Sequence, residues 1–140
     1  MSQETLGWEE WAAFPKLGVP AIVAKIDTGA RTSALHAFAI EQFGSEAKPF
    51  VRFGIHPVPD RPDIEIFCSA KMVDRREVTS SNGESELRYV IENQVQIGNE
   101  IWPIEVTLTN RENLQYRMLL GRTAIKEEMI VDPNQSFLQP

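Results

Sequence analysis

The sequence is informative first in what it lacks. Cysteine occurs once, as Cys68, so no intrachain disulfide can form and the fold is not a disulfide scaffold. Positive charge is also scarce, because 14 Lys and Arg residues stand against 20 Asp and Glu residues, for a formal net charge of −6. Nucleic-acid binding depends on clustered positive charge. The composition therefore argues against a nucleic-acid partner.

Long apolar runs are missing as well. No stretch approaches the ~20 apolar residues of a membrane-spanning helix, and residues 1–5 lack the basic start and apolar run of a signal peptide. A Gly-rich loop followed by Lys-Ser or Lys-Thr is absent, which excludes a P-loop nucleotide site. We therefore expect a protein of the reducing cytoplasm, with no membrane partner and no cofactor.

The apolar residues that are present follow the rhythm of β-strands. They alternate with polar residues in 21–28, 87–97 and 102–108, and turn-forming residues separate these runs at short intervals. Gly98-Asn99 joins two of the runs, and Asn82-Gly83 is expected at the tip of a hairpin over residues 72–95. The pattern predicts an all-β barrel or sandwich, with residues 1–140 as a single domain.

Other parts of the chain are less regular. The proline-rich residues 56–63 predict an irregular loop. Residues 122–129 contain no proline and carry Thr123 as a candidate N-cap, so they predict a short helix. Residues 6–14 fit an amphipathic helix or a strand, and their pattern does not decide between the two.

The segment with the clearest chemical content is Asp27-Thr28-Gly29, at the end of a predicted strand. Gly29 allows a tight turn, and Thr28 can hydrogen-bond locally and keep that turn rigid. A carboxylate held in this way can act as a general base if a second carboxylate shares one proton with it. Asp-Thr-Gly alone is a common turn sequence, so the prediction depends on its context: the apolar strand before it, Ala30 after it, and the later apolar run 118–121.

With that context, the sequence resembles the retropepsin-like aspartic proteases. More narrowly, it is similar to a family of bacterial and archaeal proteins that carry the label ATP-dependent zinc protease. The matching segments span residues 7–133 and are 25–36, Arg75-Arg76-Glu77-Val78, 80–83, 102–108, 118–122 and 131–133. The resemblance implies a small closed barrel with a flap hairpin and one short C-terminal helix.

The same resemblance implies a homodimer, because one subunit supplies only one catalytic loop. Asp27 of each subunit would form an aspartate dyad that activates water against a peptide carbonyl, and Thr28 and Gly29 would hold the loops in place. A substrate cleft is also implied, to which we assign Ala30, Arg31, Arg75, Arg76, Ser81, Asn82, Gly83 and Arg122.

Two of these arginines depart from the viral enzymes of this class. In those enzymes an acidic residue follows the Asp-Thr-Gly-Ala segment and pairs with an arginine after the later glycine. Here the two positions are Arg31 and Arg122, and two cations cannot form that ion pair.

The cationic residues suggest a substrate class. If the arginines converge on the cleft of an otherwise acidic protein, they would favour acidic or glutamate-rich peptides. The resemblance points the same way, since some family members occur beside an ATP-grasp ligase that adds glutamates to a ribosomal protein. Surface ion pairs with Glu77, Glu84 or Glu86 explain the arginines equally well.

The sequence offers little for a metal. His36, His56 and Cys68 do not have the close spacing of a zinc site, so no metal is expected, and His36 is only a weak candidate beside Asp27. Cys68 follows two apolar residues and is expected in the core.

Three functions remain in order of preference. The first is a dimeric aspartic peptidase. The second is a non-catalytic binding or regulatory module that keeps the protease fold and partners an ATP-grasp glutamate ligase. The third is a metal-assisted hydrolase that uses Asp27 and His36. A fold alone does not decide between such functions.

Overall fold

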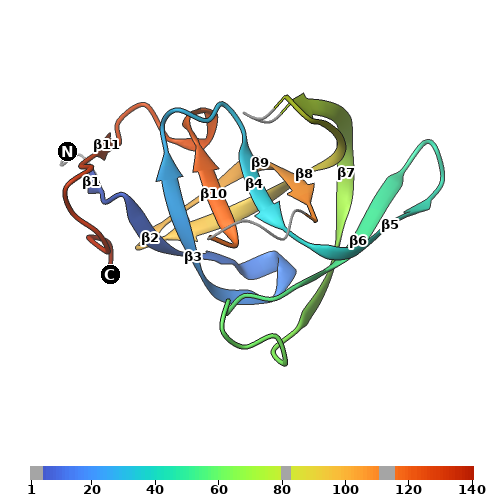
Figure 1. The fold of residues 1–140 in the computed structure, drawn as a ribbon, viewed down its shortest axis with the longest axis horizontal. Helices are drawn as coiled ribbons and strands as arrows, with labels where there is room; N and C mark the ends of the chain where they lie inside the picture. Colours follow the sequence, from blue (N-terminus) through green and yellow to red (C-terminus); the bar gives the residue numbers. More distant parts are fainter. Residues whose placement is uncertain (1–4, 80–82, 111–115) are drawn as a thin grey trace.

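The computed structural model describes residues 5–79, 83–110 and 116–140. Strands form nearly all of its regular structure (Figure 1). In chain order they are β1 Thr5–Leu6, β2 Glu9–Phe14, β3 Val19–Asp27, β4 Ser33–His36, β5 Phe38–Gly44, β6 Pro49–Ile55, β7 Ile66–Thr79, β8 Ser85–Ile97, β9 Glu100–Thr109, β10 Met118–Gly121 and β11 Ile130–Val131. Two 3-10 turns, η1 Pro15–Leu17 and η2 Arg122–Ala124, accompany them.

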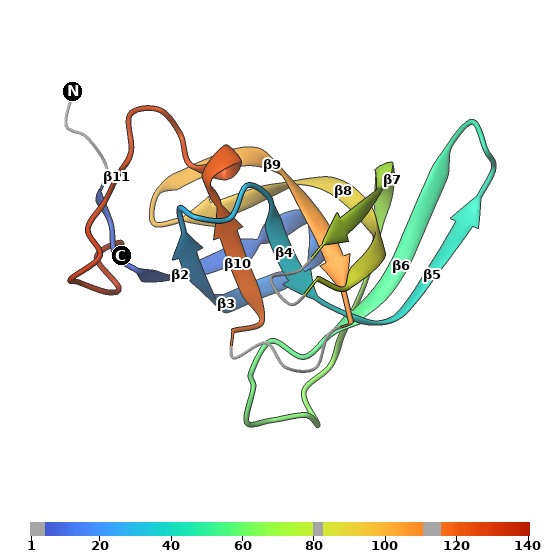
Figure 2. The ribbon, with the colours of Figure 1, turned by 45° about the horizontal axis from the view of Figure 1, so that its top comes forward.

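The strands close into a barrel. The order β2-β3-β10-β4-β9-β8 returns on itself, because Ala13 of β2 also pairs with Gln96 of β8. Beyond β8 the sheet continues through β7, β6 and β5, and the β5–β6 hairpin projects from the barrel as an arm (Figures 1 and 2). The predicted all-β barrel is confirmed.

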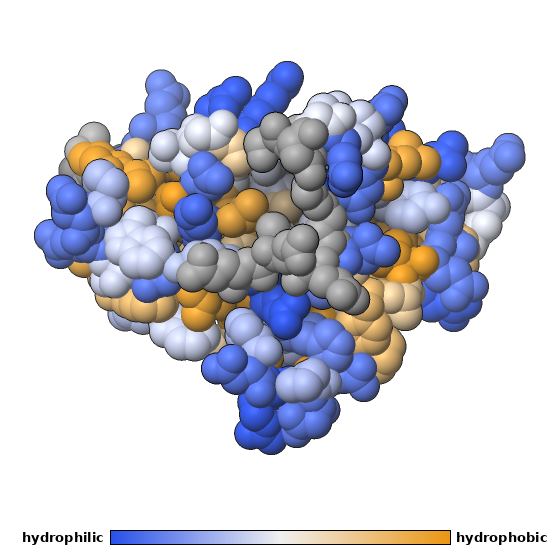
Figure 3. Space-filling view, viewed as in Figure 1, coloured by the Kyte–Doolittle hydropathy of each residue, from blue (hydrophilic) through white to orange (hydrophobic). Residues whose placement is uncertain are grey.

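The core fills the inside of this barrel. On β3 alternate residues point inward: Ile22, Ala24 and Ile26 are all buried. On the outer face shown in Figure 3, hydrophilic side chains in blue are interspersed with smaller hydrophobic patches in orange. Strand alternation in the sequence thus determines which residues form the core.

The predicted hairpins are present. Residues of β7 and β8 pair from Met72 with Ile91 to Thr79 with Ser85, and Gly83, at the end of the turn, has φ +84°. Ser81 and Asn82 lie outside the described residues. In the next hairpin Ile97 pairs with Glu100 across Gly98-Asn99, and Gly98 has φ +61°. Glycine adopts these positive angles without the steric cost that other residues meet.

The structure also shows what the proline-rich loop and the ambiguous segment near residue 10 form. Residues 56–65 form no strand, as expected for the proline-rich loop. Residues 9–14, whose pattern fitted a helix or a strand, form β2, because pairing with both β3 and β8 satisfies their backbone groups.

The predicted helix over 122–129 is wrong in extent. Only the 3-10 turn η2 forms, and Ile125 after it is extended, with φ −80° and ψ 124°. The Ala124 carbonyl, which a helix would use internally, accepts a hydrogen bond of 2.8 Å from the Trp102 indole Nε1. Tertiary contacts therefore replace helical ones in a segment too short to be a stable helix alone.

The two ends of the chain are held together by a buried carboxylate. Glu10 is fully buried on β2, and its oxygens accept hydrogen bonds from the backbone N–H groups of Gly7 at 2.6 Å, Leu138 at 2.9 Å and Gln139 at 3.0 Å. These donors compensate for the loss of water around the carboxylate. Nearby, β1 pairs in parallel with β11.

In the described ranges, no helix is both long enough and apolar enough to cross a membrane.

Candidate active site at the end of strand β3

Strand β3 places Asp27 at the end of the barrel wall. In the parallel pairing of β3 with β10, Asp27 is level with Gly121. The chain then turns, with the Gly29 N–H donating to Asp27 Oδ1 at 3.1 Å and the Ala30 N–H donating to the Asp27 carbonyl at 3.2 Å. Asp27 is half-buried, whereas Thr28 and Gly29 are exposed. One carboxylate oxygen thus fixes the side chain within its own turn.

The turn η2 holds the far side of the same loop. The Arg122 N–H donates to the Ala30 carbonyl at 2.8 Å, and the Arg122 guanidinium Nη1 donates to the Gly29 carbonyl at 3.2 Å. Thr123 donates its hydroxyl to the Arg31 carbonyl at 2.7 Å. Three consecutive carbonyls of the loop are therefore fixed by two residues of η2. Arg122, predicted to bind substrate, here supports the loop.

A buried serine links the strands next to the Asp27 loop. Ser33 is fully buried at the start of β4, and its Oγ accepts the Gly121 N–H at 3.0 Å. Its carbonyl accepts a hydrogen bond of 3.0 Å from the Thr107 hydroxyl on β9. Sequence reasoning missed Ser33 and Thr107 and gave Thr123 a different role, that of an N-cap, because the contacts of all three join segments that are distant in sequence.

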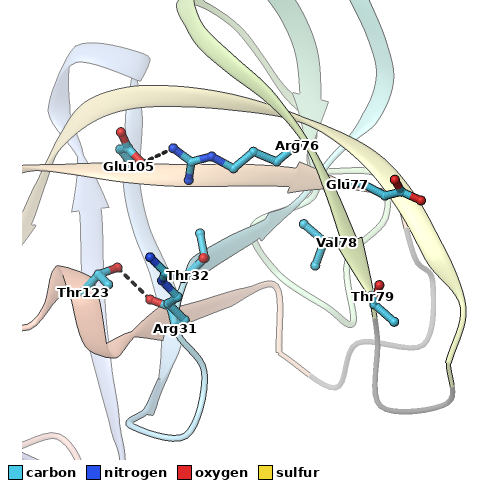
Figure 4. A pocket seen from close by; sticks show the side chains of 8 residues that line it. All are labelled: Arg31, Thr32, Arg76, Glu77, Val78, Thr79, Glu105 and Thr123. Atoms are coloured by element: carbon cyan, nitrogen blue, oxygen red, sulfur yellow. Dashed lines mark hydrogen bonds and ion pairs between the residues drawn. The ribbon is translucent and has the colours of Figure 1, made fainter.

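Beside the Asp27 loop lies a cavity of about 580 Å³ (Figure 4). It opens between that loop and the end of β7 that leads into the β7–β8 turn, with β9 behind them. Its lining residues are Arg31, Thr32, Arg76, Glu77, Val78, Thr79, Glu105 and Thr123. Charges of both signs line it, so it suits a polar occupant.

The Arg76 side chain, which lines this cavity, forms ion pairs with two acidic residues of the protein. Its Nε lies 2.8 Å from Asp74 Oδ2, and its Nη2 lies 2.9 Å from Glu105 Oε1. The hydrogen bond from Arg76 lowers the pKa of Asp74, and Asp74 together with Glu105 raises the pKa of Arg76. Such exposed pairs contribute little to stability. The charge of Arg76 is thus largely balanced within the protein.

The four predicted substrate-binding arginines converge only in part. Arg31 and Arg76 line the cavity, and Arg122 is on the loop. Arg75 directly precedes Arg76 on β7 but is not one of the residues that line the cavity. Within the described ranges no acidic side chain forms an ion pair with Arg31, whereas Arg76 is paired with Asp74 and Glu105. Arg31 is therefore the unpaired arginine of the cavity, which also contains Glu77.

His36 lies apart from Asp27. Pairing of β4 with β10 places Leu35 opposite Met118, so Ser33 is level with the Asp27 loop and His36 is three residues further along the strand. Its Nδ1 lies 3.3 Å from Arg117 Nη1, a cation that opposes metal binding there. Among residues 5–79, 83–110 and 116–140, no three His, Cys, Asp or Glu side chains are grouped to hold a metal ion.

Cys68 takes the core position expected for it. It is buried, and its thiol donates to the Leu17 carbonyl at 3.4 Å. Burial raises the pKa of the Cys68 thiol to about 11. The side chain therefore stays a neutral thiol at ordinary pH and is unsuited to act as a nucleophile.

Comparison with known proteins agrees with the fold. Residues 5–140 match the RimB-like family model, described as retropepsin-like aspartic endopeptidase RimB. A Legionella pneumophila protein of unknown function has a crystal structure that matches with a TM-score of 0.80 and 28% identity, covering 98% of each chain.

Curated relatives are longer than this chain. Proteins named "Probable alpha-L-glutamate ligase" are 53% identical in Shewanella pealeana, over 94% of this chain, and 39% identical in Desulfotalea psychrophila, over 95%. The chain spans 29% of the length of each. The family model, in contrast, covers nearly the whole sequence, and the chain belongs to the RimB-like family of retropepsin-like proteins.

Proposed function

We propose that this protein is an aspartic-type peptidase whose site is completed by a second copy of the chain. The observation that carries the proposal is the Asp27 carboxylate, fixed through Oδ1 by the Gly29 N–H at the mouth of the barrel. A carboxylate that is held in place and open to solvent can position a water molecule against a peptide carbonyl. Membership of a retropepsin-like family supports the same chemistry.

The need for two copies follows from the chemistry. Asp-Thr-Gly occurs once in the sequence, whereas a dyad that shares one proton needs two carboxylates. In the proposed dimer one Asp27 is ionised and accepts a proton from the attacking water, while the other is protonated and hydrogen-bonds the carbonyl oxygen. The exposed Thr28 beside it would brace the two loops across the twofold axis.

The cavity extends the proposal to the substrate. Arg31 has no acidic partner there, whereas Arg76 is held by Asp74 and Glu105. A preference for acidic or glutamate-rich peptides would therefore depend mainly on Arg31. The β7–β8 hairpin would cover the bound peptide and exclude water. A cytoplasmic location is part of the proposal, since the buried Cys68 is a free thiol.

A second function is favoured by one specific observation. The relatives named as alpha-L-glutamate ligases contain a region like this chain as 29% of their length. On this alternative the domain is a non-catalytic module that binds or regulates such a ligase. It predicts binding that does not depend on Asp27.

Activity of Asp27→Asn separates the two functions. Turnover of an acidic peptide library should fall by at least about 100-fold, since positioned acid–base groups contribute at least this much. Asp60→Asn, in the exposed 56–65 loop, is the control and should retain full activity. Mixing excess Asp27→Asn with wild type should lower the activity per wild-type subunit, because mixed dimers lack one carboxylate. Full activity of Asp27→Asn would refute the peptidase.

A further inference from the structure

The β7–β8 hairpin carries a well-shielded ion pair close to its turn. Arg88 Nε lies 3.1 Å from Glu86 Oε2, both on β8, and their side chains are 11% and 29% exposed. Among arginines that form ion pairs in the described ranges, Arg88 is the least exposed, and Arg52, Arg61 and Arg76 are at 39% or more. Removing charges from water costs free energy unless every charge finds partners.

Two buried threonines supply those partners. Arg88 Nη1 donates to Thr107 Oγ1 at 3.4 Å, and the Thr109 hydroxyl lies 3.2 Å from both oxygens of Glu86. Thr107 and Thr109 are both 1% exposed. Val90 pairs with Thr107 in the antiparallel β8–β9 ladder, so residues 86, 88, 107 and 109 all face the same side of the sheet.

The contacts continue from Thr107 towards Asp27. The Thr107 hydroxyl accepts from Arg88 and donates to the Ser33 carbonyl at 3.0 Å, which matches the capacity of one hydroxyl group. Ser33 Oγ in turn accepts the N–H of Gly121, the cross-strand neighbour of Asp27. Polar contacts therefore run without a break from the hairpin to the strand end beside the candidate catalytic carboxylate.

We infer that Arg88 is a positioning residue that couples the β7–β8 hairpin to the Asp27 loop. It touches no reacting group, and it acts through Thr107 and Ser33. If the hairpin shifts, Arg88 moves with β8 and the support under Gly121 changes. The consequence for peptide turnover rests on the proposed peptidase function, whereas the mechanical coupling does not.

Amide hydrogen exchange tests the coupling without any substrate. In Arg88→Met, exchange at the Gly29, Ala30 and Gly121 amides should be about tenfold faster, as expected for losing one charge-assisted hydrogen bond. The matched control is Arg52→Met on the β5–β6 arm, whose pair with Glu41 is 57% and 63% exposed. It should leave these amides at the wild-type rate.

A second pair of variants covers the case in which Arg88→Met folds poorly. Thr107→Val keeps the shape of the side chain and removes the hydroxyl, so it should accelerate the same amides. Thr107→Ser keeps the hydroxyl and should restore rates close to wild type.

Activity gives an additional readout. Arg88→Met should lower kcat more than it changes KM, because the loop is misplaced while the cavity lining is intact. If Asp27→Asn proves fully active, the peptidase fails, yet the exchange result still decides the coupling. Faster exchange confined to residues 72–79 and 83–95, with the Asp27 loop at wild-type rates in both Arg88→Met and Thr107→Val, would overturn the inference.

Discussion

Gly121 is the cross-strand neighbour of Asp27, and its α-carbon lies directly against the backbone of Thr32. A Cβ at this position would lie 2.6 Å from the Thr32 carbonyl carbon and 2.8 Å from its oxygen. No side chain fits there without moving β10 away from β4. The position of Asp27 therefore depends on Gly121, which is far from it in the sequence.

Gly121→Ala should destabilise the protein by about 1–3 kcal/mol, the usual effect of inserting a methyl group into a filled space. Chemical denaturation measures this loss. Gly29→Ala provides the comparison, because its Cβ would meet only Asp27 Oδ1 at 3.3 Å, and its loss of stability should be smaller. Equal losses in the two variants would contradict the argument.

Glu10→Ala should release the C-terminal segment. The substitution leaves the N–H groups of Gly7, Leu138 and Gln139 without their carboxylate, at a cost of about 2–3 kcal/mol in the free energy of unfolding. Hydrogen exchange in residues 132–140 should accelerate. Glu9→Ala is the control, since its carboxylate accepts from the Tyr116 hydroxyl and from no amide of the tail. Unchanged hydrogen exchange of residues 132–140 in Glu10→Ala would disprove the idea that the Glu10 carboxylate holds the C-terminal segment in place.

Arg31→Ala should narrow the difference between acidic and neutral peptides. Losing the unpaired cation of the cavity should reduce kcat/KM for acidic peptides about three- to tenfold, with little change for neutral ones. Arg61→Ala, whose side chain pairs with Asp63 in a surface loop, is the control. A constant ratio of acidic to neutral turnover in Arg31→Ala would remove the acidic preference from the proposal.

Arg76→Ala tests whether the paired arginine contributes as well. The variant frees Asp74 and Glu105 and makes the cavity more negative, so acidic peptides should bind less well. Peptide inhibition constants measured for matched acidic and neutral sequences check this. If neither class responds, Arg76 has a purely structural role.

Cys68 should make stability depend on pH in the alkaline range. Its pKa is raised from 9.0 to about 11 by burial, so the folded state keeps the proton longer than the unfolded state. The stabilisation is complete below about pH 9 and is lost as the pH rises towards 11. Denaturation of wild type and Cys68→Ala across this range should show a steeper decline in wild type. Parallel curves would mean that the thiol titrates as if it were exposed.

Local patterns in the sequence were sufficient for most strands. Residues 22, 24 and 26 alternate, and Gly98 and Gly83 adopt the positive φ that a hairpin turn requires. Period-two burial is a property of one strand, so one strand's residues reveal it. The Asp27 turn could be recognised for the same reason, because Gly29 and Asp27 are close in sequence.

What the sequence could not reveal depends on distant contacts. Thr123 suggested an N-cap, yet its hydroxyl bonds to Arg31, and Trp102 takes the carbonyl of Ala124. The burial of Glu10 depends on amides more than 120 positions away, as the separations of 128 and 129 show. A single sequence gives no signal for such pairings.

The contacts of the Glu10 carboxylate with residues near both ends of the chain also affect how this domain can be connected to other chains. Gln139 Nε2 donates to the Thr5 carbonyl at 2.7 Å, so the first and last described segments of the chain lie together, near β1 and β11 (Figure 1). A short linker could join them, and new ends opened in the 56–65 loop would give a circular permutant with the same strands. For insertion into a longer polypeptide, both connections would leave from a single point, and a fused neighbour could be attached there without interrupting any strand of the barrel.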